Sequence, residues 1–198
     1  MNEDSGLLKI IEGIAGVLDR NLNPPALGLN GVSLPEISVF GLAYPKYDSD
    51  GNAFPVVPNE SLTDEINLLP NDLLPGFCFF DYADPTTVHV GGNRSNPRLT
   101  TPLSIIFFVD FKRLKGMTKW IGDYRLFREQ FKGAITSILT NKMTALGGTL
   151  TLNKIIDKGI DDVFSGYKMN LDRMQFYQQP YYAVRFECEL NFMQKVLC

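Results

Sequence analysis

The sequence contains one histidine, His89, and no other side chain changes charge near neutral pH without a shifted pKa. It lies in Val88-His89-Val90, where its side chain alternates with two β-branched residues along an expected strand. No serine lies in a G-x-S-x-G nucleophile elbow. We therefore interpret His89 as a structural residue and expect no enzyme. A hydrolase with an unrecognised site that uses His89 is the third hypothesis for this chain.

Two pairs of carboxylates have spacings that acid–base or metal chemistry uses. Asp161 and Asp162 are adjacent, and we interpret them as first-turn charges of a short helix, where the helix dipole favours them. Glu187 and Glu189 are two residues apart in an expected strand, so they share its polar face. We expect that face to be solvated or to contact another subunit.

The three cysteines, Cys78, Cys188 and Cys198, lie far apart and form no C-x-x-C motif. This pattern predicts buried or free thiols in a reducing compartment instead of a disulfide framework. A structural zinc site would need all three cysteines together with His89. The segment 46–57 lacks the carboxylates that an EF-hand needs at its first and last positions, and no phosphate-binding glycine motif is present. No metal and no cofactor are expected.

The charge is divided unevenly along the chain. Residues 1–97 contain four basic and thirteen acidic side chains, a net charge of −9, whereas residues 98–198 contain fifteen basic and nine acidic ones, a net charge of +6. The basic side chains between 110 and 132 are Lys112, Arg113, Lys115, Lys119, Arg125, Arg128 and Lys132. Three interpretations stay open: the two halves interleave in the fold and cancel, one copy's acidic surface meets another's basic surface, or the basic segment binds a polyanion or nucleic acid.

The length of 198 residues predicts a single domain spanning 1–198. An aromatic content of 12% and a mean hydropathy of −0.05 argue against general disorder. No apolar run reaches the roughly 18 residues of a membrane span, and the acidic N-terminus is unlike a signal peptide, so no membrane contact is expected.

The first half is rich in proline, with eleven of the twelve prolines between Pro24 and Pro102. Apolar spacing predicts an amphipathic helix over 6–19, with Asp4 or Ser5 as its cap. A short strand is expected over 37–43 and a turn over 48–52. Residues 44–76 are expected to form an extended loop or arm, and strands to follow at 77–82 and 87–90, with a turn at 84–85 and a loop at 91–97.

The second half predicts more regular structure. A buried strand is expected over 103–111, a helix from Asp123 to about Met143 that ends near Gly147, and a half-buried strand over 182–192, where apolar and polar residues alternate strictly. Between them, 150–164 is expected to hold a short strand and one or two helical turns, around 155–156 and 161–164. The sum predicts an α+β fold, an antiparallel sheet with helices packed on one face and a long Pro-rich loop or arm between the first helix and the main sheet.

A helix at 7–19, a Pro-rich extended region, a strand at 104–111, a helix at 124–143 and a closing strand introduced by the aromatics of 180–187 follow one another in this chain. This order resembles that of the tail-terminator and neck (head–tail connector) proteins of tailed bacteriophages, and residues 103–193 carry most of the resemblance. The resemblance implies an α+β subunit that closes into a ring, commonly of six copies, at the head-proximal end of the tail, with no catalytic residues.

From this resemblance we expect a structural virion protein that is assembled in the host cytoplasm and joins tail to head. Its partners would be copies of itself in a homo-oligomeric ring, a hexamer or a multiple, other proteins of the neck and tail, and packaged DNA in passing contact. A head-to-tail ring needs two different complementary patches on each subunit. The candidate interface or lumen charges are Lys112, Arg113, Lys115, Lys119, Arg128, Glu187 and Glu189. The alternative is a soluble polyanion or nucleic-acid binding module that uses residues 112–132.

Overall fold

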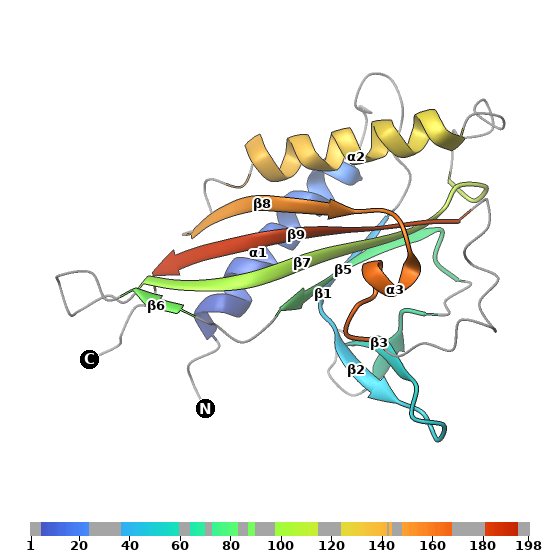
Figure 1. Ribbon diagram of the computed structural model, residues 1–198, viewed down its shortest axis with the longest axis horizontal. Coiled ribbons are helices and arrows are strands. Elements are labelled where there is room, and N and C mark those ends of the chain that lie inside the picture. The colour runs from blue at the N-terminus through green and yellow to red at the C-terminus, as the bar shows by residue number, and fades with distance from the viewer. Residues whose placement is uncertain are drawn as a thin grey trace.

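Two long antiparallel strands form the centre of the computed structural model (Figure 1). β7 (Arg98–Asp110) and β9 (Tyr181–Met193) pair along their whole lengths. β5 (Gly76–Tyr82) and β6 (Thr87–His89) pair antiparallel with β7, and β8 (Gly148–Ile156) pairs antiparallel with β9. β1 (Ser38–Leu42) completes the main sheet beside β5, which gives the order β1-β5-β7-β9-β8 with β6 next to β7.

The structure describes residues 5–23, 37–59, 64–69, 73–82, 87–89, 98–114, 124–141, 143, 148–167 and 181–193. The predictions for Asp4, the turn at 84–85, the loop at 91–97, the cap at Asp123 and the helix end at Gly147 lie outside these residues.

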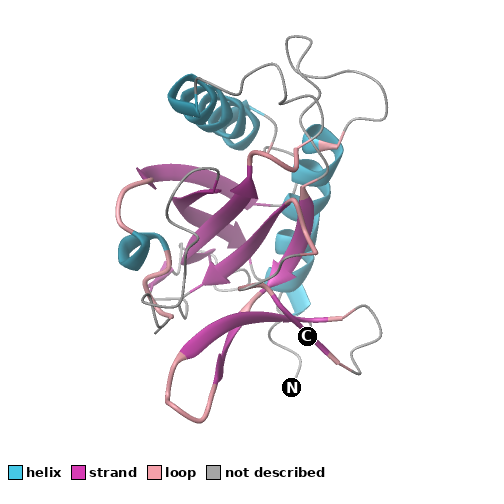
Figure 2. Ribbon diagram, turned by 90° about the vertical axis from the view of Figure 1, so that its right-hand side faces the viewer, coloured by secondary structure: helices cyan, strands magenta, loops and turns pink. Residues whose placement is uncertain are grey.

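Both long helices, α1 (Ser5–Leu22) and α2 (Tyr124–Asn141), contribute to one large apolar cluster with a single face of the main sheet (Figures 1 and 2). Alternation in β7 and β9 supplies the sheet side of this cluster, since every second residue points to the same face. Phe107 illustrates the packing, because its ring lies 5.6 Å from that of Phe131 on α2 and 5.7 Å from that of Phe186 on β9, edge to face in both cases. The predicted α+β class is confirmed, with a mainly antiparallel sheet that packs both long helices on one face.

A second apolar cluster covers part of the opposite face. The short helix α3 (Ile160–Val163) and the residue after it bring Val163 and Phe164 against Phe79 and Phe108 of the sheet. β7 is therefore buried on both faces in its second half, as its nearly continuous apolar run predicts. This face of the sheet was not predicted to carry a helix.

Three strands within the described residues 44–59 and 64–69 form a small antiparallel sheet of their own, which we call the arm. Its strands are β2 (Tyr44–Tyr47), β3 (Ala53–Pro58) and β4 (Glu65–Asn67), with β3 in the middle. Val57, Leu68 and Leu69 anchor the arm in the second cluster, and the β2–β3 hairpin projects away from the main sheet (Figures 1 and 2). Residues 44–76 were predicted to form an extended loop or arm; the loop alternative is wrong at β2, β3 and β4, because these three short strands pair with one another.

Two smaller predictions also need correction. β1 runs parallel to β5, so the main sheet contains one parallel pair at its edge. Ile155 and Ile156 belong to β8 and not to a helical turn, because they pair with Phe186 and Arg185 of β9. β-Branched residues suit such a paired position better than the interior of a helix.

Candidate functional site

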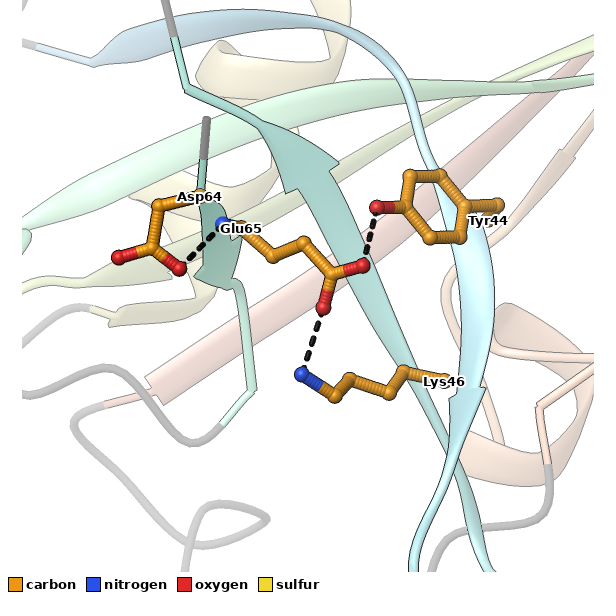
Figure 3. A network of polar contacts seen from close by, with 4 residues as sticks. All are labelled: Tyr44, Lys46, Asp64 and Glu65. Carbon is orange, nitrogen blue, oxygen red and sulfur yellow. Dashed lines mark hydrogen bonds and ion pairs between the residues drawn. The ribbon is translucent and has the colours of Figure 1, made fainter. Parts of the chain in front are cut away.

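Three side chains of the arm meet on its exposed surface (Figure 3). The Tyr44 hydroxyl donates a hydrogen bond of 2.6 Å to one oxygen of Glu65, and the Lys46 ammonium donates one of 2.5 Å to the other. Tyr44 and Lys46 are two residues apart on β2 and so share a face, while Glu65 reaches them from β4 across the middle strand. The network ties the two outer strands of the arm together.

The contacts of Glu65 shift the pKa values of the whole network. The hydrogen bond from Lys46, followed by that from Tyr44, holds the pKa of Glu65 below its ordinary value. The hydrogen bond to Glu65 raises the pKa of Lys46 and also that of Tyr44. All three groups are therefore fixed in their usual charge states at neutral pH, and the network positions side chains instead of exchanging protons.

The tip of the arm is held by a carboxylate. Asp48 accepts hydrogen bonds from the backbone N–H groups of Asp50 and Asn52 and from the side-chain amide of Asn52. Gly51 takes a φ of 78°, which glycine adopts without strain. The predicted turn at 48–52 is confirmed, and it presents an ordered hairpin tip.

Beside this network lies a shallow cleft with a volume of about 350 Å³. Its walls combine two aromatic rings with charged and amide groups: Lys46, Tyr47, Asp48, Phe54, Asn67 and Leu69. Tyr47 is 66% exposed, and all four residues of β2 lie on the surface. Exposed aromatic residues with polar neighbours are typical of protein–protein contact surfaces.

Of the five basic residues between 110 and 132 that the structure describes, three are engaged within the protein. Arg113 donates to the carbonyl oxygens of Leu73 and Leu74, at 3.1 and 3.3 Å. The Arg128 guanidinium lies over the ring of Tyr182, 5.1 Å from its centroid.

Lys132 is also engaged, since it forms ion pairs with Asp157 and Glu129 at 2.6 and 2.8 Å. Burial alone would lower the pKa of Lys132, but the hydrogen bonds to Asp157 and Glu129 raise it above its ordinary value.

Only part of the cluster is left on the surface. Lys112 and Arg125 are exposed, near the end of α2 that begins at Tyr124, and the ring of Phe111 stacks on that of Tyr124 with centroids 5.9 Å apart. Lys115 and Lys119 lie outside the described residues. The structure therefore places Lys112, Arg113 and Arg128 around the same end of α2, but it leaves only the first two of them on the surface.

Glu187 and Glu189 lie on the other face of the main sheet from α2. They alternate with the buried Phe186 and Cys188 along β9, as the sequence predicts. Glu189 accepts a hydrogen bond of 2.9 Å from Asn191, and Glu187 lies 3.7 Å from the guanidinium of Arg185. The structure thus separates these carboxylates from Lys112, Arg113 and Arg128, so the five predicted residues that it describes do not form one site.

A partly buried polar cluster borders the second apolar cluster, around Arg185. Its guanidinium donates to the carbonyl oxygen of Ser165 at 3.1 Å and lies 3.9 Å from Asp81, while its Nε is buried without a hydrogen-bond partner. The buried hydroxyl of Tyr167 also lacks a partner. Burial raises the pKa of Asp81, although Arg185 opposes the shift, and burial raises the pKa of Tyr167 as well.

The histidine and two of the cysteines considered in the sequence analysis lie in strands of the main sheet. His89 lies in β6 opposite Arg98. Cys78 and Cys188 are buried and unpaired, and burial raises the pKa of both thiols, to about 12 for Cys188, which suppresses the reactive thiolate. Within the described ranges, no group of three or more His, Cys, Asp or Glu side chains is placed to hold a metal ion. No helix in that part of the chain is long and apolar enough to cross a membrane.

Neither a protein-family model nor a curated protein matches this chain.

Sequence reasoning missed the Tyr44–Lys46–Glu65 network and the cluster of Asp81, Tyr167 and Arg185. The alternation of Tyr44 and Lys46 is a weak signal for a shared face. The partner Glu65 is 19 residues from Lys46, and no pattern in the sequence indicates which carboxylate meets them.

Proposed function

We propose that this chain is a structural virion protein of a tailed phage. It forms a ring, a hexamer or a multiple, at the neck or head-proximal end of the tail, where it acts as a tail terminator or connector that joins tail to head. It contacts other virion proteins of the neck and tail, with a passing contact to packaged DNA. The observation that carries this proposal is the arm, an ordered sheet that extends from the domain and exposes aromatic side chains.

An exposed surface of this kind needs a partner surface. Tyr44 and Tyr47 are 40% and 66% exposed on the same short strand, where a spacing of three residues puts them on opposite faces. Tyr44 is held by its hydrogen bond to Glu65, and Tyr47 directly precedes the ordered turn at Asp48. A pre-ordered aromatic surface loses little conformational entropy on binding, which favours association. The order of the elements that carry the family resemblance also supports the proposal: α1, then the Pro-rich region, β7, α2 and β9.

The test is the mass of the purified protein in solution, measured by light scattering coupled to size exclusion and by native mass spectrometry. We expect a multiple of the 22.2 kDa subunit, sixfold for a hexamer, and rings in negative-stain micrographs. Tyr47→Lys places a charge on the arm surface and is expected to shift the population toward monomer. Leu8→Lys on α1, at a position that is 42% exposed, is the matched control and is expected to assemble normally.

A strict monomer at micromolar concentration that also fails to join phage tails would overturn this proposal. Assembly that is equally sensitive to Tyr47→Lys and Leu8→Lys would show that the arm has no special part in it.

The polyanion-binding alternative depends on residues 112–132. Among the basic residues described there, Arg113, Arg128 and Lys132 are engaged within the protein, which leaves Lys112 and Arg125 as the main exposed charges. If the alternative holds, the protein should be retained on heparin in a strongly salt-dependent manner, and charge reversal at Lys112, Arg113 and Lys115 should abolish retention.

A further inference from the structure

We propose that the cleft of the arm binds the basic end of α2 on a second copy of this chain, with the Arg125 side chain as its anchor. This inference rests on the proposed function, because it identifies the contact by which the copies would join.

The cleft has the chemistry that a guanidinium requires. Tyr47 and Phe54 line the cleft and are residues on whose rings a planar cation can stack. Asp48 adds a negative charge to the same wall, although its carboxylate already accepts three hydrogen bonds within the hairpin tip. The Lys46 ammonium in its wall is already paired with Glu65. Across 44–69 the sequence contains one basic side chain and five acidic ones, so the arm as a whole attracts a cation.

The end of α2 has the complementary chemistry. Arg125 and Lys112 are exposed there, and Leu126 beside them is 42% exposed. Arg125 makes no hydrogen bond or ion pair with any residue that the structure describes, whereas Arg113 and Arg128 nearby are engaged. Like Lys112, Arg125 is thus a long basic side chain at this end that another molecule can bind without breaking a contact to any described residue.

The fold places the two surfaces apart in one molecule. The arm is anchored in the apolar cluster on one face of the main sheet, and α2 in the cluster on the other face (Figures 1 and 2). Within one copy the arm and α2 are therefore anchored on opposite sides of the main sheet. Two different patches that fit each other on successive copies make a head-to-tail contact, which closes into a ring when the rotation permits.

The outer edge of β2 is better suited to contact through side chains than to pairing with a strand of a second molecule. Pro45 lies opposite Pro55 in the β2–β3 ladder. Since neither proline has an N–H group, this is a pair that exchanges no hydrogen bonds, and the backbone of Pro45 faces the outer edge of β2. The missing donor blocks regular strand pairing at that edge.

Charge reversal in two separate chains tests the contact. Asp50→Lys changes an exposed residue at the hairpin tip without removing the Asp48 carboxylate, and Arg125→Glu changes the proposed anchor. Sedimentation velocity should show that each single variant associates at least about tenfold more weakly than the wild type, because like charges then oppose each other at every contact. An equimolar mixture of the two variants should recover association to within about threefold, since each arm then meets an α2 of opposite charge.

The matched controls are Glu12→Lys and Lys9→Glu on the exposed side of α1, which should associate like the wild type. Circular dichroism checks folding, and Arg125→Glu puts an acidic residue in the first turn of α2, where the helix dipole favours it. A wild type that assembles while the two reversals leave association unchanged, or a mixture that does not recover, overturns the docking contact but not the proposed function. A wild type that is monomeric at all concentrations and absent from tails overturns both.

Discussion

Glu65 shows how one side chain organises a surface. It belongs to a strand of three residues, yet it receives hydrogen bonds from Tyr44 and Lys46 on the other outer strand of the arm (Figure 3). Its backbone N–H in turn donates to the carboxylate of Asp64 at 2.8 Å. Glu65 is exposed, yet its hydrogen bonds with Tyr44, Lys46 and Asp64 fix its position. The bond with the Tyr44 hydroxyl in turn positions the aromatic ring of Tyr44.

The pKa of Glu65 tests this network directly. Because the hydrogen bonds from Lys46 and Tyr44 lower the pKa in the folded protein, the network stabilises the arm above the pKa of the unfolded chain, and this stabilisation is lost as the pH falls through the folded value. We expect carbon NMR of the carboxyl group to show titration below the ordinary range of a glutamate. Lys46→Met and Tyr44→Phe should each raise that value.

Removal of a distant lysine, Lys9→Met on α1, is the control and should leave the titration of Glu65 unchanged. If Glu65 titrates at its ordinary value in the wild type, the network does not persist in solution.

Single residues also show why the candidate site was only partly predictable. The spacing of the basic residues at 112–132 correctly indicated a positively charged segment. That spacing does not reveal that Arg113 donates hydrogen bonds to the carbonyl oxygens of Leu74 and Leu73, 39 and 40 residues earlier in the chain. Nor does it reveal that Arg128 stacks on Tyr182 of β9. Such contacts depend on tertiary packing, which brings together residues that no local pattern relates.

Among the elements, β9 was the easiest to predict from the sequence, and the strands of the arm were the hardest. β9 was predictable because one of its faces is buried along its whole length, so burial imposes strict alternation on the sequence. The strands of the arm are short, and β3 includes Pro55 although it is the middle strand. Proline is normally excluded from a middle strand. Pro55 is tolerated because its pair with Pro45 exchanges no hydrogen bonds and the ladder to β4 begins only at Val56, so neither ladder requires an N–H group at Pro55.

The start of β8 provides a test of the strand packing. A Cβ atom added at Gly148 would lie 2.9 Å from the carbonyl oxygen of Asn191 on β9, closer than real contacts allow, and the opposing atom is backbone that cannot easily move. We expect Gly148→Ala to destabilise the protein by about 1–3 kcal/mol, seen as a lower midpoint in thermal denaturation.

Gly41→Ala on β1 is the matched control, since its Cβ would have no atom within 4 Å and the midpoint should barely change. Equal effects of the two substitutions would show that the close approach of β8 and β9 at Gly148 does not exist in solution.

On the scale of the whole molecule, the uneven charge of the sequence has a structural counterpart. The acidic arm is anchored on one face of the main sheet, while the exposed Lys112 and Arg125 lie near the start of α2, which is anchored on the other. Of the three interpretations left open by the sequence, interleaving of the two halves does occur inside the fold, where Arg185 of the basic half lies 3.9 Å from Asp81 of the acidic half. Such internal pairing leaves the arm acidic and the start of α2 basic. Because these two opposite charges stay on separate surfaces, we favour contact between copies.

Contact between oppositely charged surfaces predicts how assembly responds to salt. The Debye length falls from about 10 Å at 0.1 M to about 3 Å at 1 M, so exposed charges on neighbouring copies attract each other less as salt is added. We expect sedimentation velocity to show weaker association at 0.5 M than at 0.05 M sodium chloride, with the thermal midpoint of the subunit nearly constant because its cores are apolar. The Arg125→Glu variant should lose most of this dependence. Association that strengthens with salt would instead show that apolar contacts dominate and that the charges of the arm and α2 do not direct assembly.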